Sequence, residues 1–167
     1  MSKSDQHPFL HLTRIDIPLE IRAYLITLLN QTLACTVDLR SQVKHAAWNV
    51  KGNAFVQLRA LFDAIAIELD AHSNLVVERI TVLGGMVQGT VRTAATQSTL
   101  PEYPGDLVEG DAHVLALAER LAHYATAIRA DIEHAADVED AATANVYTDI
   151  ARGIDQRLSF LETHLYQ

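Results

Sequence analysis

Three oxygen-bearing side chains, Asp70, Asn74 and Glu78, follow one another at intervals of four residues. On a helix this spacing places all three on one ridge. Carboxylate and amide oxygens are hard ligands that suit iron, manganese, magnesium or calcium. Rows of carboxylates are equally typical of a solvated helix face. The row therefore has two interpretations, a metal site that uses Asp70 and Glu78 or an acidic surface, and the second is the more common.

Arg59 and Asp63 are also four residues apart, so their side chains share a helix face and can form an ion pair. Asp63 and Glu78 lie roughly 22 Å apart along a single helix. They cannot hold one ion between them within one chain. A metal site that uses both therefore requires a second subunit.

The histidines, the cysteine and the tryptophan each have a structural interpretation. We expect His45 and His72 to be surface or hydrogen-bonded histidines rather than metal ligands. The tail pair His7 and His11 has ligand-like spacing only on a helix, and Pro8 opposes a regular helix there. Two residues occur only once in the chain. They are Cys35, expected to be a small buried apolar residue, and Trp48, expected to anchor a helix turn.

Apolar residues recur at helical spacing over four long segments. The first segment begins at Pro18 and ends at Val50, before Gly52. The predicted helices are Pro18 to Val50, a second capped by Asn53 and ended by Gly84-Gly85, a third from about Asp111 through Ile132, and a fourth from about Asp140 through Leu165.

The connections differ in length. Short links join the first two helices and the last two, so each pair is predicted to form an antiparallel hairpin. The segment from Gly84 to Gly110 is long enough to cross the length of a bundle, with a short helix near Gln88 to Ala95. The sequence therefore predicts an all-α, ferritin-like four-helix bundle over residues 16–167, preceded by a flexible tail over residues 1–15.

Composition excludes several classes of protein. The net charge of −8 argues against a general nucleic-acid binder, because such binding depends on clustered Lys and Arg. The N-terminus has no apolar signal-peptide core, and no stretch is long and apolar enough to span a membrane. We therefore expect a soluble, cytoplasmic protein.

Several separated motifs resemble the Dps family of mini-ferritins. They are WNVKGNAF from Trp48, LFD from Leu61, ERITVLGG from Glu78, and YPGD from Tyr103. The resemblance covers the chain from about Leu19 onward. It implies a hollow shell of twelve four-helix subunits that oxidises Fe(II), preferably with hydrogen peroxide, and stores ferric mineral. Many members also bind DNA without sequence preference.

The resemblance implies an iron-oxidation centre between two subunits related by a two-fold axis, close to Trp48. Only two of the five ligand positions keep a ligand, Asp63 and Glu78. The two histidine positions hold Ala47 and Arg59, and the second aspartate position holds Asn74. Arg59 would place a cation where iron binds, paired with Asp63 and with Glu78 across the interface.

These departures leave three functions open. The first is iron sequestration and oxidative-stress protection by a homo-oligomeric shell, a dodecamer by resemblance, with a weakened or inactive ferroxidase centre. The second is a non-enzymatic cage subunit, alone or co-assembled with an active paralogue, in which an Arg59–carboxylate network replaces the metal. The third is DNA compaction, although Lys3 and Arg14 beside Asp5 give the tail little positive charge, and we expect weak or absent DNA binding.

Overall fold

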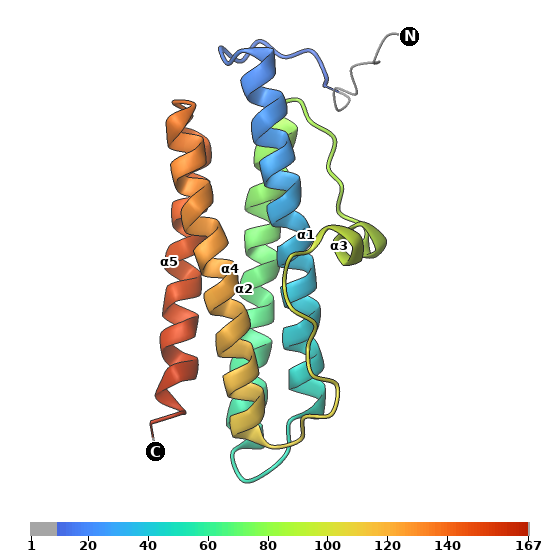
Figure 1. Cartoon of the computed structure of the whole chain (residues 1–167), viewed down its shortest axis with the longest axis vertical. Helices are drawn as coiled ribbons and strands as arrows, with labels where there is room; N and C mark the ends of the chain where they lie inside the picture. Colours follow the sequence, from blue (N-terminus) through green and yellow to red (C-terminus); the bar gives the residue numbers. More distant parts are fainter. Residues whose placement is uncertain (1–9, 167) are drawn as a thin grey trace.

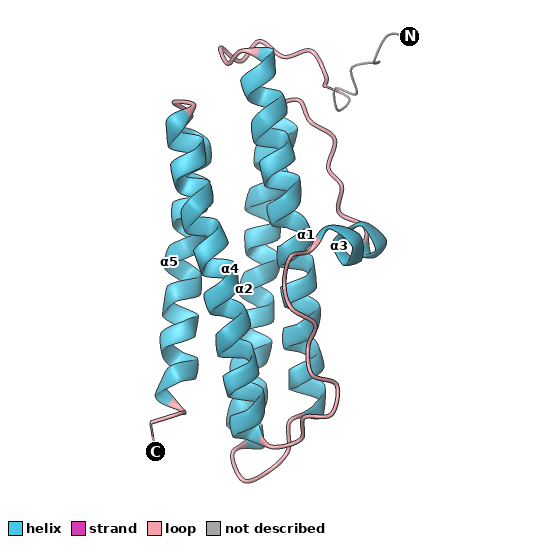
Figure 2. Cartoon of the chain, in the orientation of Figure 1, coloured by secondary structure: helices cyan, strands magenta, loops and turns pink. Residues whose placement is uncertain are grey.

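The structure, a computed structural model, describes residues 10–166 of the chain. Four long helices run side by side as two hairpins, and a short helix lies in the connection between them (Figure 1). Within the described residues the remaining segments are loops and turns, with no named strand (Figure 2). The predicted all-α ferritin-like bundle is confirmed. The helices are α1 (Leu19–Asn49), α2 (Phe55–Val82), α3 (Val91–Gln97), α4 (Gly110–Asp137) and α5 (Ala141–Thr163).

The turn between α1 and α2 differs from the prediction in its capping. The residue at the N-cap of α2 is Ala54, which makes no side-chain capping bond, so the predicted cap by Asn53 is wrong. Instead, the backbone N–H of Phe55 donates to the carbonyl oxygen of Gly52 at 3.2 Å. Gly52 has a φ of +102°, a conformation that glycine adopts without the strain of a Cβ. The turn is therefore closed by backbone geometry.

The short helix of the crossover, α3, begins slightly later than predicted, because Thr90 is the N-cap of α3. The Thr90 hydroxyl accepts a hydrogen bond from the backbone N–H of Thr93 at 3.2 Å. Two side chains of α1 hold the crossover against the bundle. Asn30 donates to the carbonyl oxygen of Met86 at 3.0 Å, and Gln31 donates to that of Gln97 at 2.6 Å.

The core lies between the four long helices and consists of the apolar stripes predicted from the sequence. Two residues of the predicted stripes are exceptions, because Tyr24 remains 43% exposed and Leu165 39% exposed. Full burial of a large apolar side chain contributes about 1.5–3 kcal/mol, so these stripes are the main source of stability. The largest fully buried side chains include Phe62, Leu25, Leu29, Leu69, Tyr124 and Tyr147.

Buried polar groups join the two hairpins at specific points. The hydroxyl of Thr36 lies 2.6 Å from that of Tyr124, and Thr32 lies 3.1 Å from Tyr147. These bonds satisfy both phenol groups inside the core. They join α1 to α4 and to α5.

A charged contact at the α4–α5 turn joins α2 to the second hairpin. The guanidinium of Arg79 donates to both carboxylate oxygens of Asp140 at 2.9 and 2.8 Å, and to the hydroxyl of Thr143. Asp140 is also the N-cap of α5, which therefore begins where the sequence predicted a helix start. One carboxylate therefore both caps a helix and binds a neighbouring helix.

The segment before α1 packs against the end of α2. The backbone N–H of His11 donates to the carbonyl oxygen of Gly84 at 2.7 Å. Gly84 has a φ of +84°, and a Cβ there would lie 2.8 Å from the carbonyl oxygen of His11. The other half of the predicted tail pair, His7, lies outside the described residues, and the boundary between tail and domain at residue 15 stays a prediction.

A single β-bridge connects the two loops at the opposite end of the bundle. It pairs Lys51 with Glu109, through a hydrogen bond from the Lys51 N–H to the Val108 carbonyl oxygen at 3.1 Å. No helix among residues 10–166 is both long enough and apolar enough to cross a membrane.

Candidate metal centre

The residues expected to bind iron lie on the outward face of α2. Asp63 is 39% exposed at its side chain, and Asn74 and Glu78 are exposed further along the same helix. The 28-residue helix separates Asp63 from Glu78 by about four turns. The described part of a single chain brings together no group of three or more His, Cys, Asp or Glu side chains that could hold a metal ion. A centre that uses Asp63 and Glu78 therefore needs residues from a second chain.

Asp63 already has a positively charged partner, and that partner is Lys44 of α1. The Lys44 ammonium nitrogen lies 2.7 Å from Asp63 Oδ1. The same ammonium lies 5.7 Å from the centre of the Trp48 ring, within the range of a cation–π interaction. Lys44 comes one helical turn before Trp48, so both side chains point toward the same corner of the α1–α2 hairpin.

The predicted pairing of Arg59 with Asp63 is corrected by this contact. Arg59 is exposed, and within residues 10–166 it makes no ion pair in the single chain. Lys44 reaches Asp63 from the neighbouring antiparallel helix. The sequence signal for the Lys44–Asp63 pair was weak, because contacts between helices depend on their packing and not on spacing along one helix.

The proposed accessory ligand Asp70 is also neutralised. Arg40 of α1 binds it through two hydrogen bonds, from Nε to Oδ1 at 2.8 Å and from Nη2 to Oδ2 at 3.3 Å. Both carboxylate oxygens are therefore engaged by a guanidinium, which offers no lone pair to a metal. Of the three carboxylates in the sequence prediction, only Glu78 has no cationic partner within the described part of the chain.

The first lost histidine position, Ala47, belongs to the packed core. Ala47 is only 1% exposed, whereas its neighbour Trp48 is 65% exposed. Trp48 was expected to anchor the helix turn, but most of its side chain is exposed in the single chain. The helix turns its small residue inward and its largest residue outward.

His72 is neither a surface histidine nor a ligand of the predicted centre. It is buried on the inward side of α2, with Nε2 at 3.9 Å from Glu68 Oε1, and Glu68 is bound in turn by Arg157 of α5. Burial lowers the pKa of His72, an effect that the charge of Glu68 opposes and that of Arg157 reinforces. This cluster faces α5 and is separate from Asp63.

His45 belongs to a second group, which the sequence analysis did not identify. Its ring meets the Tyr103 ring edge-on, with the centroids 5.4 Å apart. The Tyr103 hydroxyl lies 2.7 Å from Nδ1 of the fully buried His113, and the guanidinium of Arg120 lies 5.3 Å from the Tyr103 ring centre. Burial raises the pKa of Tyr103 to about 12, so its hydroxyl keeps its proton at neutral pH. The only sequence signal was the turn Tyr103-Pro104-Gly105, which marks a loop but not its contacts.

The donor set of the single chain does not fit iron at Asp63. A lysine ammonium occupies the hydrogen-bonding position of the carboxylate, and neither histidine position holds an imidazole. An ammonium has three donors and no lone pair. The arrangement is that of an ion pair beside an exposed aromatic ring.

Comparison with known proteins shows the family. The ferritin-like domain family matches residues 26–167. A DNA protection during starvation protein from Agrobacterium fabrum is 34% identical over 94% of this chain and 97% of its own length. The chain belongs to the Dps family. A solved structure, DpsA14 from Streptomyces coelicolor, has a TM-score of 0.90 and 27% identity, with 96% of this chain and 95% of that chain covered.

A second Dps structure agrees with the first. DpsC from Streptomyces coelicolor has a TM-score of 0.89 at 25% identity, covering 95% of this chain and 92% of its own. The matched lengths include both hairpins and the crossover. The departures at Ala47, Arg59 and Asn74 therefore lie within an intact Dps fold.

Proposed function

We propose that this Dps protein forms a hollow homo-oligomeric shell, a dodecamer with two-fold inter-subunit sites, for iron sequestration and oxidative-stress protection. In this proposal the ferroxidase centre is degenerate, and iron oxidation there is slow or absent. Membership of the Dps family supports the shell and the iron role. The observation that carries the degenerate centre is the 2.7 Å contact between the Lys44 ammonium and Asp63. An ion pair at this carboxylate competes with any metal for the same oxygen, and the substitutions at Ala47, Arg59 and Asn74 remove the other ligands that would favour the metal.

The test follows the single tryptophan, which lies beside this ion pair. Metal-free assembled protein is titrated anaerobically with Fe(II) while Trp48 fluorescence is recorded, and hydrogen peroxide is then added. We expect a flat titration and no rapid oxidation phase. Saturable quenching at about one or two irons per subunit, followed by fast oxidation, would show instead that the subunits build a working centre.

A second candidate function is a non-enzymatic cage subunit, and the charges on α2 favour it. Arg59 and Glu78 are exposed on the outward face, and within residues 10–166 neither makes an ion pair. Arg59 lies ten residues before Leu69 and Glu78 nine residues after it. Two copies of α2 packed antiparallel about this midpoint would therefore bring Arg59 of each copy to Glu78 of the other.

Charge exchange distinguishes this interface from a metal-bridged one. Arg59→Glu and Glu78→Arg are each expected to weaken the dimer, because each creates like charges across the axis. The combined variant is expected to recover assembly, measured by sedimentation at low protein concentration. Failure of the double variant to recover would argue against an Arg59–Glu78 contact.

An active paralogue that co-assembles with this chain would be found by mixing the two and measuring mixed shells by native mass spectrometry.

DNA compaction is the third candidate, and the charge balance opposes it. The relatives carry the name DNA protection during starvation protein, but this chain has a net charge of −8. We expect little DNA binding at about 150 mM salt, since affinity depends on phosphate contacts by Lys and Arg. A clear band shift by the assembled protein at that salt concentration would contradict this expectation.

A further inference from the structure

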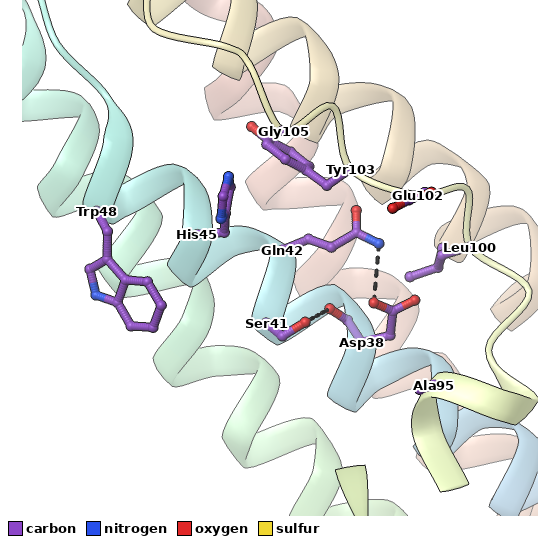
Figure 3. A pocket seen from close by; sticks show the side chains of 10 residues that line it. All are labelled: Asp38, Ser41, Gln42, His45, Trp48, Ala95, Leu100, Glu102, Tyr103 and Gly105. Atoms are coloured by element: carbon purple, nitrogen blue, oxygen red, sulfur yellow. Dashed lines mark hydrogen bonds between the residues drawn. The ribbon is translucent and has the colours of Figure 1, made fainter. Parts of the chain in front are cut away.

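Residues 103–107 of the crossover form a strap over the first turns of α4, with no helix of their own. Figure 3 shows Tyr103, the first residue of this strap, beside His45 and Gln42 of α1. Within the described chain, the strap makes no backbone–backbone hydrogen bond. Segments of this kind open at a lower free energy than the helices beneath them. The strap therefore depends on its side chains and on its two ends.

Both ends of the strap are held by hydrogen bonds to the rest of the fold. Before the strap, the guanidinium of Arg120, only 5% exposed, donates to the carbonyl oxygen of Glu102 at 2.5 Å. After the strap, the Lys51 amide donates to the carbonyl oxygen of Val108 at 3.1 Å. These two points can act as hinges, so opening can be confined to residues 103–107.

Between the hinges, one polar contact joins the strap to the interior of the bundle. The Tyr103 hydroxyl lies 2.7 Å from Nδ1 of His113, and the two rings are stacked with their centroids 6.0 Å apart. His113 is fully buried, and its Nε2 has no hydrogen-bonding partner in the described structure. A neutral imidazole is tolerated in this position, whereas a charged one would be buried with an unpaired donor.

The charged and titratable groups around this contact make a proton on His113 still less favourable. They come from three elements: His45 of α1 meets the Tyr103 ring edge-on, and Arg120 of α4 lies 5.3 Å from the centre of that ring. Burial and the His45 ring both lower the pKa of His113, and only the backbone of Leu107 opposes them. Three exposed carboxylates of the neighbouring chain make no ion pair with His113 in the described structure: Glu102, Asp106 and Glu109.

We propose that acidification releases the strap: protonation of His113 detaches residues 103–107 from α4 while the four long helices stay folded. Both nitrogens of a protonated imidazole are donors, and the buried Nε2 gains water as a partner once the strap moves away. The helix itself is fixed by the core, so the strap is the part that moves. This device goes beyond the iron chemistry proposed above and uses neither Asp63 nor Glu78, so each proposal can fail without the other.

Cleavage by a glutamyl endopeptidase after Glu102 measures this opening in the assembled, metal-free protein. The rate is divided by that of a free peptide of residues 98–109, which corrects for the effect of pH on the protease. Between pH 7.5 and pH 5.5 the corrected rate should rise about tenfold. The reason is that only the opened form, whose histidine has an ordinary pKa near 6.5, gains the proton in this range.

Two results would overturn the proposal. A corrected rate that does not change with pH would show that the strap is not released by acid. Cleavage after Glu133, an exposed residue within α4, at the same rate as after Glu102 would show that the whole bundle unfolds instead.

His113→Asn tests the trigger, because asparagine can still bond to the Tyr103 hydroxyl but does not titrate. The tenfold rise should shrink to less than twofold in this variant. His123→Asn, which changes an exposed histidine of α4, is the matched control and should keep the full rise. A full rise in His113→Asn would assign the trigger to another group and overturn the proposal.

Tyr103→Phe tests the contact without any change at His113, and it decides the matter if His113→Asn does not fold. Loss of the hydroxyl should raise the corrected rate at pH 7.5 about fivefold, the effect of one net hydrogen bond. Each variant is compared with a peptide of its own sequence. Tyr166→Phe, at a tyrosine that is 84% exposed, is the control and should cleave as the unmodified protein does. Equal rates for the two variants would show that the Tyr103–His113 bond does not hold the strap.

Discussion

The hydroxyl of Tyr103 lies 2.7 Å from Nδ1 of His113, and the other ring nitrogen of His113 is buried with no hydrogen-bonding partner in the described structure. Burial lowers the pKa of His113, so the ring is neutral at physiological pH. A neutral ring suits this position, because Arg120 lies over the same Tyr103 ring. Protonation would add an unpaired charge to a site that already holds a guanidinium.

Stability is therefore expected to fall on mild acidification. His72 and His113 both have a folded-state pKa below the ordinary histidine value of 6.5, so the unfolded chain binds more protons as the pH falls. The contribution is complete above pH 6.5 and is lost progressively from there toward the lowered folded-state pKa values. Urea unfolding at pH 7.5 and pH 5.5 should give a lower midpoint at pH 5.5. His113→Gln should reduce this difference, and an unchanged difference would show that His113 does not contribute to it.

Asp140→Ala is expected to destabilise the protein by about 2–4 kcal/mol. The substitution removes the N-cap of α5, and it leaves the partly buried Arg79 without its carboxylate partner. Burial works to raise the pKa of Asp140, but the hydrogen bonds from Thr143 and Arg79 outweigh it and hold the pKa below its usual range. The stability from this carboxylate is therefore lost only in strong acid, as the pH falls through that lowered pKa. Thermal unfolding measures the loss.

The control for this variant is Asp149→Ala, whose partner Arg152 lies on the surface. Exposed pairs contribute about 0–1 kcal/mol, so the change should be small. Equal losses for the two variants would mean that the Arg79–Asp140 contact does not join the hairpins as described.

Gly153→Ala is expected to destabilise α5 even though alanine is the better helix former. A Cβ at residue 153 would lie 2.5 Å from Glu68 Oε1 and 3.0 Å from His72 Nε2. Glu68 is held by Arg157, so it cannot move away without losing that ion pair. We expect a net loss of about 1–2 kcal/mol, typical of overpacking. Gly105→Ala is the control, because nothing lies within 4 Å of the added methyl group, and chemical denaturation should separate the two variants.

Ala47→His alone is expected to cost about 1–3 kcal/mol, because residue 47 is 1% exposed and packed in the core. Restoration of the remaining ligands, Arg59→His and Asn74→Asp, changes exposed positions and should cost little. The loss of stability in the triple variant should therefore come mainly from the substitution at residue 47. A triple variant with unchanged thermal stability would show that this corner has room for an imidazole.

Lys44→Met is expected to release Asp63 with little effect on stability, since the ion pair is partly exposed and contributes about 0–1 kcal/mol. Trp48 loses its neighbouring ammonium at the same time, so its emission should change in the absence of any metal. Lys51→Met is the matched control, as Lys51 is exposed and is not part of this contact. Identical spectra for the two variants would contradict the Lys44–Trp48 contact.

The sequence predicted the helices well because their apolar stripes extend over many turns. The first two helices and the long crossover appear where the periodicity and Gly84 placed them, within a few residues. Asp140 was identified as the start of α5 because its capping is local to the chain. Asn53 was misassigned because Gly52, with its positive φ, closes the turn through the backbone instead.

The candidate centre was predicted only in part, for a physical reason. The i, i+4 spacing of Arg59 and Asp63 indicated an ion pair along one helix, whereas Asp63 is bound by Lys44 from the adjacent helix. Likewise, Asp70 is bound by Arg40. Periodicity along one helix gives the face of a side chain but not the register between two helices. The contacts of Tyr103, Arg120 and His113 join segments far apart in sequence and had no local signal at all.

The bridge between Lys51 and Glu109 couples the opening of the two loops at one end of the bundle. The Lys51 amide donates to Val108, so the α1–α2 turn and the last residues of the crossover form one hydrogen-bonded layer. Opening either loop exposes backbone groups of the other to solvent. The Lys51 amide should therefore exchange its hydrogen far more slowly than surface loops usually do, and the two loops should become accessible to proteases together.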